Sequence, residues 1–389
     1  MLAYNSQTLD NLEIREEAEK ALRKNCISVD TYKAITTAHP VNLYTPNPMI
    51  RVGLFILTCI IVCFSLGLLT LMMLGMVKNE RNISGIGIFA GLLCYGALEL
   101  FVRAKNLFRA GVDDALLWSA LLLLCVSIGF AGLNDNKVYP LVVFLITLTA
   151  TLRFADMMVA GVSYLALLSA IFYQTVLLGN GGKIVVPFIM ISISLGIYVL
   201  VRRWMKNKVF RHYQNCLTVV SVLSLATLYL AGNYYVVREL SNMLFDLEHV
   251  EDPGIPGGWF FWIWTTVVPL IYIALGIRSK DAILLRTGMI LIAAIVFTVR
   301  YYHHIMPLET AMVVGGLLLT AGAWALIRYL KTPRNGFTYA APEDPSLADK
   351  LKIESLVIAQ TYTPGSTGPV TNTQFGGGSG GGGGASGEY

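Results

Sequence analysis

Long apolar runs alternate with short polar segments along most of the chain. Runs of about twenty residues carry no charge or carry charge only near an end, and a helix of that length crosses about 30 Å of hydrocarbon. The fourth run, "VYPLVVFLITLTATL", is short, so it is either a partial span or a span that continues through Arg153. The pattern predicts an all-α polytopic transmembrane bundle of about ten helices, at 52–77, 84–102, 112–133, 138–152, 157–178, 184–201, 216–237, 259–277, 282–299 and 307–328.

Polar segments flank this apolar region. Apolar residues between Ile14 and Leu22 follow helical spacing, and Ser28 can act as the N-cap of a second short helix. The other end of the chain closes with "FGGGSGGGGGASGEY", a composition that favours a flexible coil. The chain therefore divides into a cytoplasmic helical hairpin at 1–50, a transmembrane bundle at 51–331 with an outer loop at 238–258, and a cytoplasmic Pro/Gly-rich tail at 332–389.

Composition agrees with a membrane protein. Apolar residues make up 55% and charged residues 14% of the 389 residues, and the mean hydropathy is +0.62, whereas soluble domains average roughly 25% charged residues. The first fifty residues contain no removable signal peptide, so we expect the first span to direct insertion.

The positive charges predict an orientation. With the N-terminus inside, 23 of the 29 Lys and Arg residues fall in inner segments and 6 fall in outer segments. Such loops stay on the cytoplasmic side, so the sequence predicts that both termini are cytoplasmic. The net charge of +5 is then a topology signal rather than a nucleic-acid footprint, because no basic face interleaved with aromatic residues is present.

Motifs of the common enzyme classes are missing from the sequence. There is no HExxH, GxSxG, Walker loop or pair of intramembrane aspartates, and the six cysteines lack metal-type spacing. We therefore expect no enzymatic activity and no cofactor.

Ionisable residues near helix ends are candidate functional groups, because charge inside lipid is costly. Glu99 can pair with Arg103 four residues on, and Asp113 and Asp114 can cap the third predicted span. Arg153 and Asp156 can form a local ion pair, and uncharged residues within spans can bond between helices. Alternatively, a polar cavity for a solute would be lined by Arg153, Asp156, Gln174 and Asn233.

The outer loop holds a second group of candidates. The predicted orientation places five potential ligands on the outer side: His249, Glu251, Asp252, His303 and His304. A zinc site needs three or four converging ligands, but adjacent histidines on a helix point about 100° apart. The alternative is an interfacial turn with Tyr301 and Tyr302 at the headgroups. The first half of the loop, from Arg238, is expected to form a short amphipathic helix on the membrane.

Three stretches carry a family resemblance: "LRKNCISVDTYKAI", "LYTPNPMIRVGLFILT" and "FTVRYYHHIMPLETAMVVGGLLL". They resemble a family of uncharacterised bacterial multispanning membrane proteins with a short cytoplasmic helical segment before the bundle. The resemblance implies a bacterial inner-membrane location and provides no site residues.

The sequence favours a non-enzymatic membrane scaffold or sensor that acts through its cytoplasmic ends. Its expected partners are the lipid bilayer and proteins that bind the cytoplasmic termini, with no nucleic acid. The alternative is a transporter of a small solute or ion, which would need polar groups near the membrane midplane, whereas nearly all charges lie at helix ends.

Overall fold

A computed structural model describes residues 2–73, 80–131, 138–176, 182–245 and 257–302, with scattered residues between 310 and 331. The chain divides into two units, residues 1–303 and 304–389, and the helices α1 to α12 all belong to the first unit. Most of the tenth predicted span and all of the tail from residue 332 lie outside the described residues.

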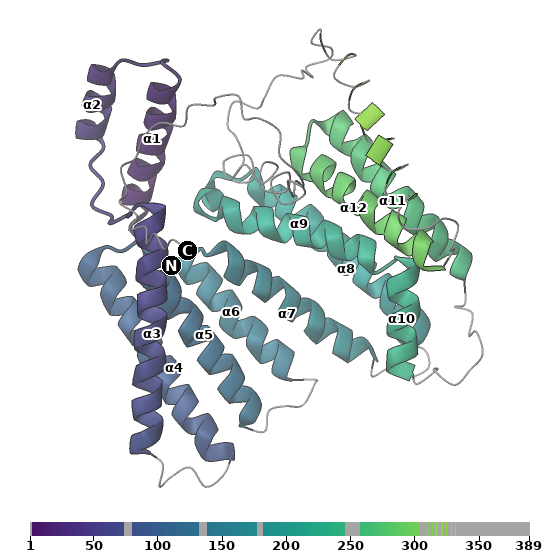
Figure 1. The fold of residues 1–389 in the computed structure, drawn as a ribbon, viewed down its shortest axis with the longest axis horizontal. Helices are drawn as coiled ribbons and strands as arrows, with labels where there is room; N and C mark the ends of the chain where they lie inside the picture. The colour runs from purple at the N-terminus through teal and green to yellow at the C-terminus, as the bar shows by residue number, and fades with distance from the viewer. Residues whose placement is uncertain are drawn as a thin grey trace, which may run out of the picture. The chain divides into compact units, whose positions relative to one another are not determined.

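The described part of the chain is helical (Figure 1), which confirms the predicted all-α class. A β-bridge joins Tyr44 to Leu107, and no strand occurs among the described residues. The α-helices are α1 (Ser6–Arg23), α2 (Val29–Ala38), α3 (Pro48–Met72), α4 (Glu80–Lys105), α5 (Val112–Phe130), α6 (Tyr139–Phe154), α7 (Met157–Val176), α8 (Gly182–Met205), α9 (Gln214–Leu230), α10 (Tyr234–Phe245), α11 (Gly258–Ser279) and α12 (Ala282–Tyr302), and the 3-10 helix η3 covers Lys208–Tyr213.

Eight helices within the described ranges are long and apolar enough to cross a membrane. The chain is therefore a multi-pass membrane protein by length and composition. The helix α6 is also apolar, but its 16 residues extend about 24 Å, which is shorter than the hydrocarbon layer. The predicted total of ten spans and the cytoplasmic position of both termini stay predictions.

The spans pack mainly as antiparallel neighbours in sequence, α4 with α5, α6 with α7, α8 with α9, and α11 with α12. At the turn between α11 and α12, Gly276 allows close approach: a Cβ there would lie 2.7 Å from the Leu285 backbone nitrogen. Small residues of this kind let membrane helices pack backbone against backbone. Buried apolar side chains form one core among α3 to α7 and a second among α9, α11 and α12.

The short α6 has a defined end. Ala155 follows Phe154 with a left-handed φ of 52°, and its N–H bonds to the Thr151 carbonyl oxygen at 2.9 Å. The fourth predicted span therefore continues through Arg153, as one of the two alternatives expected, and stops at Phe154.

The predicted span at 216–237 is wrong in its extent, because the structure divides it into α9 and α10. The helix α9 ends at Leu230, and the Asn233 side chain accepts hydrogen bonds from Tyr235 N (3.0 Å) and Val236 N (3.3 Å) to start α10. An asparagine that caps a new helix interrupts the old one. The helix expected in the outer loop from Arg238 thus begins earlier, at Tyr234.

Before the spans, α1 and α2 form a helical hairpin. The Asn5 side chain caps α1 by accepting from Gln7 N at 3.0 Å. Ser28 caps α2 by accepting from Thr31 N at 3.2 Å, as predicted.

Candidate functional site

Charged side chains gather where the N-terminal hairpin meets the bundle. At this end α4, α6, α8 and α11 finish, and α3, α5, α7, α9 and α12 begin. We call it the hairpin end. Its ion pairs join helices that are distant in sequence: Arg153 with Glu99, Arg51 with Asp114, and Arg202 with Asp281.

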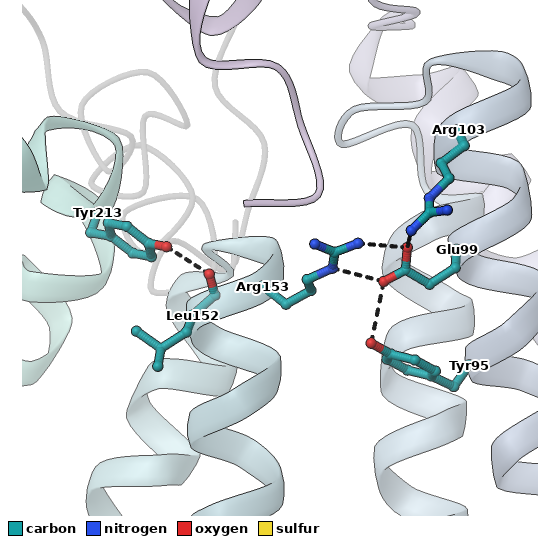
Figure 2. A network of polar contacts seen from close by, with 6 residues as sticks. All are labelled: Tyr95, Glu99, Arg103, Leu152, Arg153 and Tyr213. Atoms are coloured by element: carbon teal, nitrogen blue, oxygen red, sulfur yellow. Dashed lines mark hydrogen bonds and ion pairs between the residues drawn. The ribbon is translucent and has the colours of Figure 1, made fainter. Parts of the chain in front are cut away.

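Glu99 is the centre of the most extensive of these networks (Figure 2). Arg153 donates from Nε to Oε1 at 2.8 Å and from Nη2 to Oε2 at 2.9 Å. Arg103 approaches Oε2 at 3.4 Å, and the Tyr95 hydroxyl donates to Oε1 at 3.2 Å. The Glu99 side chain is 17% exposed and that of Arg153 is 30% exposed. This bidentate pair ties α4 to α6 at the hairpin end.

The predicted local pair between Arg153 and Asp156 is wrong. Arg153 turns toward Glu99, whereas the Asp156 side chain caps α7 and accepts from Met158 N (2.9 Å) and Val159 N (2.8 Å). The left-handed turn at Ala155 separates the two residues, because it ends one helix and starts another between them. The expected pair between Glu99 and Arg103 is present but longer than the pair with Arg153.

Neighbouring aspartates at the start of α5 have different roles. Asp113 is buried in the first turn of α5 and accepts a hydrogen bond from Ala110 N at 2.8 Å. Ala110 lies before the N-cap Gly111, so this bond fixes the preceding turn and does not cap the helix as expected. Asp114 instead accepts from Arg51 on α3, with distances of 3.0 Å to Nε and 2.6 Å to Nη2. The hairpin end thus fixes α3 to α5 and α4 to α6.

The N-terminal segment inserts into this arrangement. Ala3 N donates to the Arg153 carbonyl oxygen at 2.8 Å. Tyr4 stands edge-on to Phe108, with ring centroids 5.0 Å apart. Burial raises the pKa of Tyr4 above its usual value, and the nearby carboxylates of Asp113 and Asp114 raise it further. The phenol therefore remains neutral around pH 7.

A small pocket lies beside Tyr4, also lined by Asp113, Asp114, Asp156 and Arg109. Its volume of about 20 Å³ is enough for roughly one water molecule. Tyr4 thus covers the acidic side chains at the centre of the hairpin end.

The first helix of the hairpin reaches a second group of spans. Arg211 of η3 pairs with Asp10 and lies 3.5 Å from Glu13, both on α1. Next to this contact, the Tyr213 hydroxyl donates to the Leu152 carbonyl oxygen of α6 at 2.6 Å (Figure 2). The N-terminal region therefore touches α6 through Ala3 and the segment before α9 through Asp10 and Glu13.

The four residues proposed for a polar cavity do not lie together. Asp156 precedes α7 and Gln174 lies near its other end, about 27 Å away by helical rise. Asn233 lies between α9 and α10, where its Nδ2 donates to the Tyr229 hydroxyl (2.9 Å) and to Thr298 Oγ1 on α12 (3.1 Å). Asn233 thus makes the interhelical bond expected of an uncharged polar residue within a bundle.

The proposed outer metal ligands, His249, Glu251, Asp252, His303 and His304, all lie outside the described residues. Within the described ranges, no group of three or more His, Cys, Asp or Glu side chains could hold a metal ion. The outer-side metal site stays a hypothesis.

Hydroxyl groups in the middle of the bundle were missed by the sequence-based prediction. The Tyr164 hydroxyl of α7 lies 2.5 Å from Thr227 Oγ1 of α9, which donates to Ser194 Oγ of α8 at 3.1 Å. Ser194 is fully buried. Serine, threonine and tyrosine are common in apolar helices, so no sequence signal separates these three from their neighbours.

No family model, curated protein or solved structure matches the chain. The resemblance to uncharacterised bacterial multispanning proteins therefore stays a prediction.

Proposed function

We propose that this chain is a non-enzymatic scaffold or sensor of the bacterial inner membrane, with the N-terminal hairpin as its output element in the cytoplasm. The observation that carries the proposal is the bridging position of the hairpin. The segment before α1 binds the end of α6 through Ala3, and α1 itself binds η3 through Asp10. A relative movement of α6 and α9 would therefore change how the hairpin is held.

The two attachments differ in strength. Tyr4 is partly buried beside Phe108, and the preceding residue makes a backbone hydrogen bond. The pair between Arg211 and Asp10 is half exposed, with side-chain exposures of 47% and 38%, and such pairs contribute about 0 to 1 kcal/mol. Tyr4 is then the fixed anchor, and the contact with η3 is the one that a small movement can open.

The surface offered to a protein partner is the second helix of the hairpin. No residue of α2 is buried, and Val29 is more than half exposed. A partner that binds α2 would meet a helix whose position depends on the spans behind it, which suits a scaffold or sensor.

The middle of the bundle favours this proposal over a solute transporter. The hydroxyls of Tyr164, Ser194 and Thr227 bond to one another. A transport site would need polar groups directed toward a solute near the membrane midplane. The described charges instead concentrate at the hairpin end, where they join helix to helix.

Hydrogen exchange of the full chain in lipid nanodiscs tests the coupling. In Arg211→Glu, we expect faster exchange of the α1 backbone amides, because the new carboxylate repels Asp10 and Glu13. The matched control is Lys208→Glu, which makes the same change of charge at an exposed lysine of η3. Equal exchange in the two variants would contradict the bridging role.

Crosslinking in cells tests the output. A photoreactive residue in place of Lys33 on α2, which is exposed, should capture a specific set of proteins. We expect Arg211→Glu to change the yield of that set and Lys208→Glu to leave it unchanged. In a second experiment the photoreactive residue replaces Lys208, and the full chain is compared with a variant that lacks residues 2–45. Capture of the same proteins by both would refute the role of the hairpin.

A further inference from the structure

A long apolar groove lies between α3 and α4, with α5 as its floor. One part of about 400 Å³ is lined by residues such as Thr58 and Val62 of α3, Ala97 and Phe101 of α4, and Leu116 of α5. A second part of about 450 Å³ extends toward the opposite end of the helices, and Leu66 lines both parts. Each volume is in the range of sites that hold small molecules.

The dimensions of the groove identify a narrow occupant. Along α4 it extends from Ile83 to Phe101, about 27 Å by helical rise. The two volumes divided by that length give a mean cross-section of about 30 Å², less than half that of a helix with its side chains, which is about 10 Å wide. A single hydrocarbon chain fits within this space, whereas a helix with its side chains would lie mostly outside it.

The lining offers little to a polar ligand. Thr58 donates to the Leu54 carbonyl oxygen at 2.8 Å, and Thr70 donates to the Gly67 carbonyl oxygen at 2.8 Å. Ser84 likewise donates to the Ser127 carbonyl oxygen at 2.5 Å. Five hydroxyl-bearing residues line the groove, these three together with Ser65 and Ser127, and all its other lining residues are apolar or cysteine. The groove therefore presents a mainly apolar surface along its length.

Cations lie where the groove meets the hairpin end. Lys105 follows Phe101 by four residues, so it shares the groove face of α4, and its side chain is exposed. Arg51 precedes Thr58 by seven residues on the corresponding face of α3, and its Nε and Nη2 bind Asp114. The Nη1 group of Arg51 and the ammonium of Lys105 therefore remain for an acceptor at the mouth.

We propose that this groove binds one acyl chain of an anionic phospholipid whose phosphate lies at Lys105 and Arg51. The chain occupies the part nearest the hairpin end, where Ala90 to Phe101 extends about 16 Å, close to half of a hydrocarbon layer of about 30 Å. The lipid belongs to the same leaflet as the hairpin end. Binding at this site is independent of whether the hairpin recruits a protein partner.

Native mass spectrometry of the full chain tests the proposal. The protein is exchanged into vesicles of equal phosphatidylglycerol and phosphatidylcholine and then extracted into mild detergent. We expect one retained phosphatidylglycerol, and in Lys105→Gln a preference for that lipid reduced about five-fold, the factor expected for one lysine near a headgroup. Lys208→Gln is the matched control, because Lys208 is an exposed lysine on η3. Equal retention of the two lipids by the unaltered chain would overturn the proposal.

A filled groove gives the second test. Ala97→Phe should abolish retention of the lipid, whereas Leu92→Phe, on an exposed position of α4 outside the groove, should retain it. A photoreactive phosphatidylglycerol with a diazirine in the acyl chain should label peptides containing 58–69 and 90–101 in the unaltered chain, a result that does not depend on how a variant folds. Labelling confined to other helices would overturn the proposal. It would also be overturned if the unaltered chain were a dimer and Ala97→Phe converted it to a monomer, because the groove would then hold a second copy of the chain.

Discussion

The hairpin end and the middle of the bundle hold their helices together with different polar groups. At the hairpin end, ion pairs such as Glu99 with Arg153 join α4 to α6, and Arg51 with Asp114 joins α3 to α5. In the middle, the hydroxyls of Tyr164 and Thr227 join α7 to α9. The difference follows from solvation, because a charge costs several kcal/mol at the centre of a bilayer and much less near the surface.

The ion pairs at the hairpin end and the hydroxyl groups in the middle of the bundle determine different properties of the protein. A bidentate ion pair is directional and strong where water is partly excluded, so it selects which helix ends lie side by side. A pair of hydroxyl groups contributes less to the free energy of unfolding than an ion pair does. It also requires no charge to be removed from water. The chain can therefore vary its interior hydroxyls with small effects, while changes at the hairpin end affect both packing and the position of the N-terminal hairpin.

The largest expected effect is at Gly111, where α5 starts at the hairpin end. Gly111 has a φ of 93°, and a Cβ there would overlap the Arg51 carbonyl oxygen. We expect Gly111→Ala to lower the free energy of unfolding by about 3 kcal/mol, because the strained backbone and the displaced α3 add together. Unfolding of the purified protein in mixed micelles measures the loss.

The control is Gly96→Ala on α4, since nothing lies within 4 Å of the added carbon. A glycine-to-alanine change within a helix is favourable by about 0.5 to 1 kcal/mol, so this variant should be unchanged or slightly more stable. If both variants lost the same amount, the close approach of α3 to α5 at Gly111 would be refuted.

A second effect is expected at Glu99. In Glu99→Ala, Arg153 and Arg103 lose their shared carboxylate while Arg153 remains mostly buried. Breaking a fully buried pair costs about 3 to 5 kcal/mol. The partial exposure of this pair reduces the expected loss of unfolding free energy to about 2 kcal/mol.

A double-mutant cycle separates the pair from other effects of the substitution. Adding Arg153→Ala to Glu99→Ala should recover part of the loss, because the guanidinium that lost the Glu99 carboxylate is removed as well. The matched control is Glu19→Ala, whose partner Arg23 is 76% exposed, and we expect it to cost less than about 1 kcal/mol. Strictly additive losses for Glu99 and Arg153 would refute a coupled pair.

The positions of the spans could be predicted because lipid imposes both length and hydropathy on a helix. Helices occur at nine of the ten predicted positions, and the tenth lies largely outside the described residues. The predicted span at 216–237 is the one that the structure divides into two helices, α9 and α10. It carries no charge, so hydropathy cannot detect its division, although "GNYY" from Gly232 contains a helix-ending glycine followed by a capping asparagine.

The partners at the hairpin end could be predicted only where they are local in sequence. The pair of Glu99 with Arg103 follows from a spacing of four residues. Arg153 lies 54 residues from Glu99, and nothing in one sequence links the two. For the same reason, the contacts of Tyr4 with Phe108 and of Arg211 with Asp10 were missed, since they depend on how separate helices pack.

The smallest expected effect is in the middle of the bundle. Thr227→Val removes the hydroxyl that links Tyr164 to Ser194 and keeps the shape of the side chain. Hydrogen bonds between membrane helices average about 0.6 kcal/mol and reach about 1.7 kcal/mol, so we expect a loss of about that average in the same unfolding measurement. Thr149→Val is the matched control, because Thr149 is exposed and bonds within α6 to the Ile146 carbonyl oxygen. A loss at Thr227 as large as that at Glu99 would show that the interior hydroxyls stabilise the bundle as strongly as the ion pairs do, and the contrast between the two regions would be wrong.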